Sequence, residues 1–460
     1  MQKTYQDLLE VGEREDQRMD FILQLIRSRD DEQLYRMAKV ADKYDRHQNV
    51  TIKEFQKMLY TVTGKAIPDN YSANYKLASR FFNRFVVQEN QFLLGNGITW
   101  EKEETVSKLG NDFDNKMQTI GKNALVHGIS FGFWNFDHLE AFNYLEFIPL
   151  FDEENGSLSA GVRYWQINPQ KPLRATLYEL DGYTEYIWRN GQGEVLKEKR
   201  KYITKYVSTE ADGTIIYDGE NYPGFPIVPM YGNPHHQSEL EGLQEQIDCF
   251  DLIKSGFANS VDEASLIYWT IKNAGGMDDI DMAEFVQRIR RLHVATASDD
   301  ASAEPHQIEA PYNSRETLLD RLRSDLYEDA MALDTKNIAG GAVTATQIKA
   351  AYEPLRSKSS QFEYCVLDFL QGIMAIADID DKPTFTPDML INQNEEIQTI
   401  VSAAEFLEQE YVTTKIMTIL GDADKVDEVI KRMVDNEINT GFLDRDNQGG
   451  AKSNGEGDTE

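Results

Sequence analysis

Cysteine is scarce in this chain of 460 residues, which contains only Cys249 and Cys365. Two cysteines are too few to build a disulfide framework or a four-ligand zinc site. Both lie within helical apolar patterns, so we expect them to be buried free thiols. This usage fits assembly in a reducing cytoplasm.

Long apolar runs are also missing. No stretch reaches the roughly 18 consecutive apolar residues that a membrane-spanning helix needs, so no membrane partner is expected. The first residues, from Met1 to Gln6, lead into a mixed polar region without the apolar core of a signal peptide. We therefore expect no secretion signal.

Positive charge is in short supply, with 47 Lys and Arg against 78 Asp and Glu and a net charge of −31 at pH 7. A protein that neutralises phosphates usually carries a basic excess or stripe, so this surface as a whole should not wrap DNA tightly. Two interpretations remain. The charge provides solubility, or it lines a path along which DNA slides without sticking, because like charges remove deep energy minima.

Recognisable catalytic and ligand-binding motifs are lacking. His235 and His236 are adjacent on a turn, where two side chains rarely converge on one ion, so a surface loop is predicted. The glycines at 95, 97, 340 and 341 lack the strand-before-helix frame and the lysine-plus-hydroxyl ending of a phosphate loop. No nucleophile elbow or Cys/His dyad is present. We predict no metal, no cofactor and no enzymatic site.

Helical patterns fill the first part of the chain. One runs from about 74 to 94 and ends at Gly95-Asn96-Gly97, and a second runs from about 103 to 127. Between 144 and 230 the chain changes to aromatic and β-branched residues with turn pairs such as Asn155-Gly156 and Asn190-Gly191. That texture predicts an antiparallel meander.

A long helix is predicted from 238 to 264. Its apolar positions recur in steps of three and four: Leu240, Leu243, Ile247, Phe250, Ile253, Phe257 and Val261. The opposite face is acidic, and we expect it to be exposed: Glu239, Glu241, Glu245, Asp248 and Asp251. A second helix at 313–333 carries Leu318, Leu319, Leu322 and Leu326, and we expect Phe250 and Leu322 to lie on buried faces.

A third helical pattern covers about 344–377, and Pro354 inside it predicts a kink or a break. Its apolar stripe consists of Ile348, Tyr352, Leu355, Phe362, Val366, Phe369, Leu370 and Ile373. Shorter helices are expected at about 394–407, 412–420 and 425–435. The polar tail beyond 444 is predicted to be disordered. The fold class is therefore α+β and mainly helical.

Three stretches of this sequence resemble the portal proteins of tailed bacteriophages, in the branch common among long-tailed phages. Residues 128–132 with 145–153 are similar to that family's passage from helix to sheet. Residues 226–230 with 243–251 are similar to its entry into the first stem helix. Residues 342–349, after a small-residue loop, are similar to its tunnel loop opening into a kinked wing helix. The likeness covers about residues 75–435.

The resemblance implies a portal fold with these parts: wing (1–237), first stem helix (238–265), clip (266–312), second stem helix (313–334), tunnel loop (335–343), kinked wing helix (344–378), crown (379–443) and tail (444–460). It implies a dodecameric ring of the chain with itself at one capsid vertex of the virion. The implied partners are the terminase large subunit, the major capsid and scaffolding proteins, a head-completion or tail-connector protein, and double-stranded DNA passing through the channel.

The resemblance also implies channel residues in the tunnel loop: Thr335, Lys336, Asn337, Ile338, Ala339, Gly340, Gly341, Ala342 and Val343. Short side chains let many copies crowd one opening, and Lys336 is a candidate phosphate contact. A plain connector between helices is the alternative for this loop. Arg288, Arg290 and Arg291 form the densest basic cluster, either a clip contact or a solvated face paired with acids.

Two other functions compete with a portal. One is another viral head–tail adaptor or shell component, although such proteins lack two long helices flanking a small mixed domain. The other is a soluble enzyme, which needs a pocket with convergent polar groups.

Overall fold

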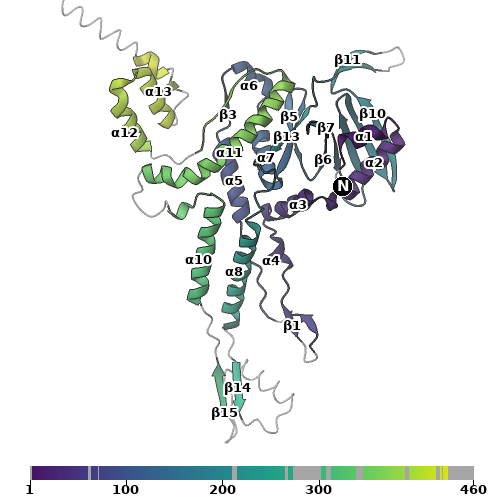
Figure 1. The fold of residues 1–460 in the computed structure, drawn as a ribbon. Helices are drawn as coiled ribbons and strands as arrows, with labels where there is room; N and C mark the ends of the chain where they lie inside the picture. Colours follow the sequence, from purple (N-terminus) through teal and green to yellow (C-terminus); the bar gives the residue numbers. More distant parts are fainter. Residues whose placement is uncertain are drawn as a thin grey trace, which may run out of the picture. The chain divides into compact units, whose positions relative to one another are not determined.

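The computed structural model describes residues 3–60, 64–70, 72–209, 215–264, 268–272, 302–306, 312–337, 345–388, 393–420, 425–426 and 428–433. The chain forms two compact units (Figure 1). The larger unit contains Met1–Leu333 and Pro354–Asp388, and the smaller contains Asp334–Glu353 and Met389–Glu460. The architecture is mixed α+β, in agreement with the predicted class.

The larger unit contains these helices: α1 (Tyr5–Val11), α2 (Glu15–Ser28), η1 (Arg29–Asp31), α3 (Gln33–Asp45), α4 (Val50–Glu54), α5 (Phe81–Leu94), α6 (Glu103–Leu109), α7 (Phe113–His127), α8 (Gln244–Ala264) and α10 (Tyr312–Asp329). Most of α11 (Ala345–Ala377) also belongs to it. The main core lies where α5, α7 and α11 bring their apolar faces together, with Met117, Ile120 and Val366 fully buried.

Three strands, β4 (Ile129–Asn135), β5 (His138–Asn143) and β13 (Ile227–Tyr231), form an antiparallel sheet beside this core. Phe369 of α11 lies against β4 at Gly132, where an added Cβ would approach the ring Cζ to 2.4 Å. A glycine at 132 therefore permits the close contact between the helix and the strand.

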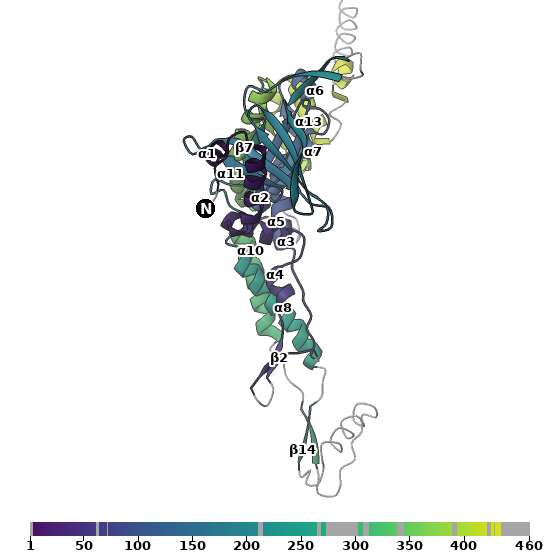
Figure 2. The same ribbon diagram turned by 90° about the vertical axis from the view of Figure 1, so that its right-hand side faces the viewer.

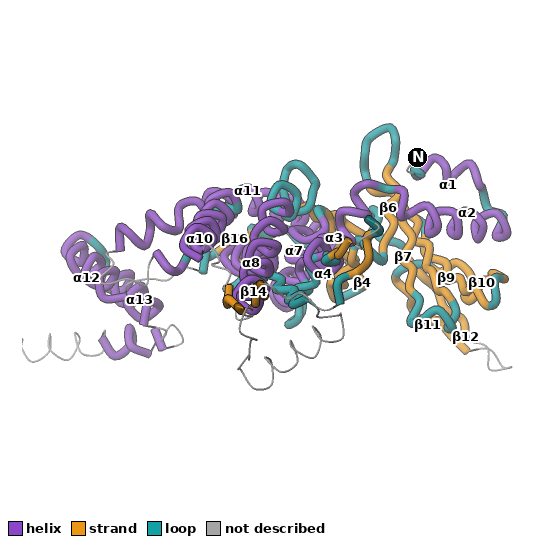
Figure 3. Tube along the Cα trace, turned by 90° about the horizontal axis from the view of Figure 1, so that it is seen from below, coloured by secondary structure: helices purple, strands orange, loops and turns teal. Residues whose placement is uncertain are grey.

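A five-stranded antiparallel meander runs in the order β10-β9-β8-β7-β6, as predicted for this region. Its strands are β6 (Phe147–Phe151), β7 (Leu158–Trp165), β8 (Leu173–Glu179), β9 (Gly182–Arg189) and β10 (Gln192–Arg200), followed by the separate ribbon β11 (Ile203–Thr209) and β12 (Ile215–Glu220). Phe21, Ile22 and Leu25 of α2 pack on inward-facing residues of the meander. In the view from below, α1 and α2 lie along these strands (Figure 3).

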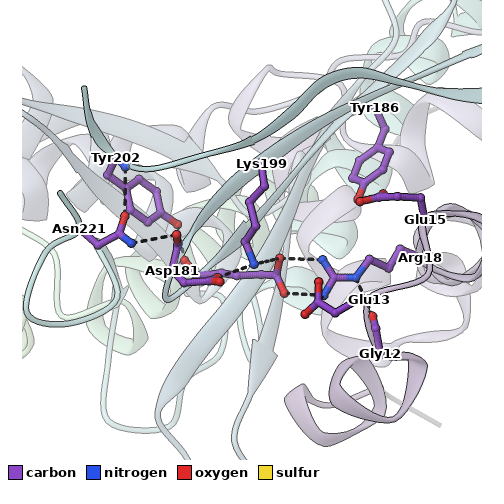
Figure 4. A network of polar contacts seen from close by, with 10 residues as sticks. Gly12, Glu13, Glu15, Arg18, Asp181, Tyr186, Lys199, Tyr202 and Asn221 are labelled. Carbon is purple, nitrogen blue, oxygen red and sulfur yellow. Dashed lines mark hydrogen bonds and ion pairs between the residues drawn. The ribbon is translucent and has the colours of Figure 1, made fainter. Parts of the chain in front are cut away.

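A polar network attaches these first helices to strands β8, β9 and β10 of the meander (Figure 4). The buried guanidinium of Arg18 donates to both carboxylate oxygens of Glu179, at 3.0 and 3.2 Å. Lys199 bridges Glu179 and Asp181, and the Tyr186 hydroxyl donates to Glu15 at 2.8 Å. Because buried charges are costly unless paired, this bidentate contact sets the position of α2.

The antiparallel helices α8 and α10 form a pair that extends from the core (Figure 2). The remaining paired strands are short: β1 (Met58–Tyr60) with β2 (Ala66–Pro68), β3 (Ile98–Trp100) with β16 (Pro383–Phe385), and β14 (Tyr268–Lys272) with β15 (Ser302–His306). Strand β16 lies within the predicted crown but pairs with β3 of the larger unit.

The smaller unit contains η2 (Thr335–Asn337), the first residues of α11, α12 (Gln393–Ala403), η3 (Ala404–Phe406) and α13 (Gln409–Leu420). The 3-10 turn η3 separates α12 from α13, close to the predicted boundary between two helices. The predicted disordered tail, 444–460, lies outside the described residues.

Several boundary predictions are wrong. The helix expected from 74 begins at Phe81, and the one expected from 238 begins at Gln244. The helix expected over 103–127 is two helices, separated at Gly110, which has φ +79°. The predicted break at Pro354 is also wrong, because α11 continues through it. A kink there remains a prediction.

The burial predicted for the cysteines is wrong for Cys249, which is exposed on α8, and Cys365 is half-buried. Phe250 and Leu322 are each half-buried rather than buried. The helical spacing placed these positions near the partner helix, but a pair of helices covers only part of each apolar stripe.

Candidate channel loop and its anchors

The predicted channel loop begins in the described part of the chain. Thr335, Lys336 and Asn337 form η2, and the Lys336 side chain is exposed. The backbone N–H of Lys336 donates to Asp334 Oδ1 at 3.0 Å. The other loop residues, Ile338, Ala339, Gly340, Gly341, Ala342 and Val343, lie outside the described residues, as do Arg288, Arg290 and Arg291.

The chain just before the loop is held by one side chain of α5. Gln88 Nε2 donates to the backbone oxygen of Leu333 at 3.1 Å, and the backbone N–H of Leu333 donates to Gln88 Oε1 at 3.0 Å. One turn earlier, Arg84 Nη1 donates to the hydroxyl of Tyr327 on α10 at 2.6 Å. The end of α10 is therefore attached to α5 by both backbone and side chain.

The chain after the loop is attached to the same helix by a buried ion triad. Lys358 Nζ of α11 lies 2.7 Å from Glu89 Oε2 of α5 and 2.7 Å from Glu239 Oε2, just before α8. Burial raises the pKa of the Glu89 carboxyl to about 7, against the lowering effect of Lys358. Burial opposes the charge on Lys358, but the two carboxylates outweigh it and raise the pKa of its ammonium.

The three elements joined by this triad are far apart in the sequence. Helix α11 adds an apolar face to the attachment: Phe362, Val366, Phe369, Leu370 and Ile373 are all buried. These residues follow the predicted stripe of the third long helix, and that prediction is confirmed. The chain up to Leu333 and helix α11 from Pro354 onward thus rest on a packed core through α5.

The α8–α10 pair is joined along its length by polar and aromatic contacts. Gln246 donates to Asp329 near the core, and Arg315 Nη1 donates to Ser260 Oγ at 2.6 Å far from it. The rings of Phe257 and Tyr312 lie 5.7 Å apart. These pairings define the antiparallel register of the two helices.

The acidic face predicted for α8 is only partly open to solvent. Glu241 and Glu245 are exposed, but Asp251 has 0% exposure. Asp251 accepts from Asn49 Nδ2 at 2.5 Å and from the backbone N–H of Ser79 at 2.8 Å. Burial raises the pKa of the Asp251 carboxyl, against these hydrogen bonds. The prediction of a solvated face is wrong at Asp251.

Asp248 also belongs to this covered face. Its carboxylate accepts from Thr51 Oγ1 at 2.7 Å and from the Tyr44 hydroxyl, whose pKa is raised to about 12 by burial and by this carboxylate. Hydrogen bonds therefore contribute to the packing of the N-terminal segment around α4 on α8.

The sequence contained signals for these contacts. Helix α5 contains six polar residues among eight apolar ones, Gln88 and Glu89 included, and a polar group that such a helix buries needs a partner. On α8, Asp251, Ser255 and Asn259 recur every four residues and so share one face. Both patterns indicate polar partners, but neither identifies which segment supplies them.

Other chemistry is limited in the described part of the chain. None of its helices combines the length and apolarity needed to cross a bilayer. Among the same residues, no three His, Cys, Asp or Glu side chains come together as metal ligands. His235 and His236 are exposed, and the His236 ring stacks on Tyr231 with 3.6 Å between centroids, which confirms the predicted surface loop.

A profile of the family described as "Phage portal protein, SPP1 Gp6-like" matches residues 23–439. The chain is similar to the portal protein of Bacillus phage SPP1, with 24% identity over 337 residues that cover 68% of this chain and 64% of that protein. It is also similar to the portal protein of Clostridium phage phiCD119, with 27% identity over 183 residues that cover 37% of this chain and 40% of that protein. The matches thus span less than two thirds of either relative.

Among solved structures, the chain is similar to the neck of a native gene transfer agent particle computed with C12 symmetry. That match has 10% identity and a TM-score of 0.41, and it covers 73% of this chain and 89% of that chain. The neck of an empty particle computed with C6 symmetry matches at 10% identity and a TM-score of 0.43, over 74% of this chain and 90% of that chain.

Proposed function

Because this chain belongs to the SPP1 Gp6-like family of phage portal proteins, we propose that twelve copies form a closed ring at one vertex of a phage capsid. Double-stranded DNA passes through the central channel of the ring during packaging and ejection. The role is structural rather than catalytic. The proposed partners are the terminase large subunit, the capsid and scaffolding proteins and a head-completion or tail-connector protein, with assembly in the cytoplasm of the host.

The parts of a portal are assigned within this proposal as follows. The stem is the α8–α10 pair, the clip is the segment between these helices that includes β14 and β15, and the wing comprises the sheets with α1–α7. The tunnel loop runs from Thr335 to Val343, α11 is the wing helix that follows it, and the smaller unit with α12 and α13 supplies the crown.

The family match over residues 23–439 carries the proposal. The α8–α10 pair supports it independently, because Val261, Tyr312 and Leu318 are 48%, 41% and 45% exposed at its far half. Large apolar side chains that one chain leaves open are typical of surfaces that another chain covers. Contact between different surfaces of successive copies closes into a ring under cyclic symmetry.

Negative-stain imaging and light scattering of the purified full chain test the ring. We expect annular particles with an axial hole and a mass near twelve times 52.6 kDa. Several protein and salt concentrations are needed, because mass action controls assembly. A monomeric mass under all of these conditions contradicts the proposal.

A further inference from the structure

The segment between α4 and α5 leaves the core and returns to it. We call its described residues within 55–79 the arm; it contains the β1–β2 hairpin and an extended return along α8 (Figures 1 and 2). All three residues of β2 are exposed. A two-stranded hairpin with open faces is only marginally stable in water, so the arm gains order when another surface packs on it.

The return of the arm is fixed to α8 by a ladder of hydrogen bonds. Three backbone N–H groups donate to side chains of α8: Tyr75 to Asn259 Oδ1 at 2.7 Å, Leu77 to Ser255 Oγ at 2.9 Å, and Ser79 to Asp251 Oδ1 at 2.8 Å. Two residues of extended chain advance about 6.6 Å and four residues of helix about 6 Å, so the two repeats match. The ladder therefore places the arm in one register along α8.

The arm exposes an unusual number of large apolar side chains. Five of them are between 38% and 50% exposed: Phe55, Met58, Ile67, Tyr75 and Leu77. The ladder uses the backbone of Tyr75 and Leu77 and leaves their side chains exposed. Val261 and Leu318 of the helix pair also stay exposed while the arm lies on its own α8. The arm of one chain therefore does not cover the open surface of its own helix pair.

The charges of the two surfaces are opposite. Residues 55–79 contain three Lys and one Asp, a net charge of +2 in a chain with a net charge of −31. Helix α8 contains one Lys and five Asp or Glu, and α10 contains three Arg and five Asp or Glu, so the pair has a net charge of −6. A basic arm on an acidic helix pair favours contact between them.

We propose that the arm docks on the α8–α10 pair of the neighbouring copy in the ring and clasps successive subunits together. The proposal rests on the ring proposed above and names one of its interfaces. Apolar side chains of the arm cover Val261, Tyr312 and Leu318 of the neighbour, and its basic residues face the acidic helices. The hydrogen-bond ladder positions the arm by fixing where it leaves its own α8.

Cysteine cross-linking tests which surfaces meet. In a Cys249→Ser, Cys365→Ser background, Met58→Cys or Ile67→Cys is combined with Leu318→Cys, and assembled particles are treated with a short bismaleimide. We expect a ladder of cross-linked chains on a denaturing gel. Ile167→Cys combined with Leu318→Cys is the matched control, because Ile167 is exposed but lies outside the arm. We expect no ladder from it.

A charge substitution tests whether the contact stabilises the ring. The Met58→Asp, Ile67→Asp variant should keep the circular dichroism and melting temperature of the single chain but raise the concentration for half-assembly at least 10-fold, whereas Ile167→Asp should not. Two results contradict the docking of the arm on the neighbouring copy but not the ring itself. One is that the paired cysteine variants form rings without a cross-link between chains, and the other is that the Met58→Asp, Ile67→Asp variant assembles normally. A wild-type chain that never forms rings overturns the proposed function itself. If the Met58→Asp, Ile67→Asp variant forms normal rings that no longer bind a labelled DNA duplex, the arm binds nucleic acid instead, and its docking on the neighbouring copy is contradicted.

Discussion

The two halves of the α8–α10 pair differ in how completely one chain buries them. Near the core, Ile247 and Leu326 are fully buried, and the ring of Tyr327 packs edge-on against Phe85 with 5.2 Å between centroids. In the far half, Val261, Tyr312 and Leu318 remain exposed although the helical pattern continues unchanged. The same periodic sequence thus builds a core in one half and leaves exposed apolar side chains in the other.

The difference arises from what lies beside the helices. In the near half, α5 supplies a third apolar surface and the polar anchors Arg84, Gln88 and Glu89. In the far half, the segment beside α8 is the extended return of the arm, which is attached by hydrogen bonds from its backbone and leaves Val261 and Leu318 exposed. Two helices alone cannot enclose each other's stripes, so a third surface decides which half is buried.

A charge placed in the two halves should have different consequences, and this is the largest effect we expect. Leu326→Asp buries a carboxylate without a partner and should lower the free energy of unfolding by at least about 3 kcal/mol. Leu318→Asp, on the same helix, should leave the melting temperature of the single chain within about 2 °C of wild type, since exposed substitutions change stability little, but block ring assembly. Thermal melts and light scattering measure both. Equal destabilisation by the two variants contradicts the distinction.

The buried triad of Glu89, Lys358 and Glu239, beside the near half of the α8–α10 pair, should make the stability of the chain depend on pH. Because burial raises the pKa of Glu89 from 4.5 to about 7, the folded state holds this proton more tightly than the unfolded state. Its contribution to stability is then complete below about pH 4.5 and is lost as the pH rises through about 7, an effect of about 3 kcal/mol. Glu89→Gln should remove this decline in melts between about pH 5 and pH 8. Glu241→Gln, at an exposed site, should retain it.

The two hydrogen bonds between Gln88 and the backbone of Leu333 should contribute less to stability than the triad, because both partners are neutral. Gln88→Ala leaves both backbone groups of Leu333 without this partner, which should cost about 1–2 kcal/mol. Hydrogen exchange should then rise at Leu333 while the buried amides of α7 keep their protection. Gln91→Ala, at an exposed position one turn away on α5, is the control. Unchanged hydrogen exchange at Leu333 would show that the hydrogen bonds from Gln88 are not needed to hold the end of α10.

The smallest effect on stability should come from Lys336, which is exposed and outside both halves of the pair. Lys336→Glu should leave melting and ring assembly unchanged. If the loop contacts DNA phosphates, the same variant should package less DNA with a matched terminase and procapsid. Normal packaging by this variant removes the phosphate role. Normal packaging after the whole loop, 335–343, is replaced by a Gly/Ser linker removes the channel assignment.

Local pattern predicted much of the fold. The turn pairs between 144 and 200 predicted the meander, and the stripe from Phe362 to Ile373 predicted the buried face of α11. Boundaries were weaker, because residues 74–80 follow a helical apolar pattern but extend along α8 as a partner for its side chains. Tertiary hydrogen bonds there outweigh a weak local preference for helix.

For the candidate site too, the sequence determined the local features and the tertiary structure decided the long-range contacts. The sequence alone determined which segments are amphipathic, where the small-residue loop lies between two long helices, and the resemblance to a family, since each of these depends on residues near one another in the chain. Only the tertiary structure decided that Gln88 holds Leu333, that Glu89 holds Lys358 of α11, and that Asp251 is buried under the arm. Those contacts join residues from about 170 to about 270 positions apart. A helical period tells which side of a helix is apolar or polar, but it contains no information about which distant segment covers that side.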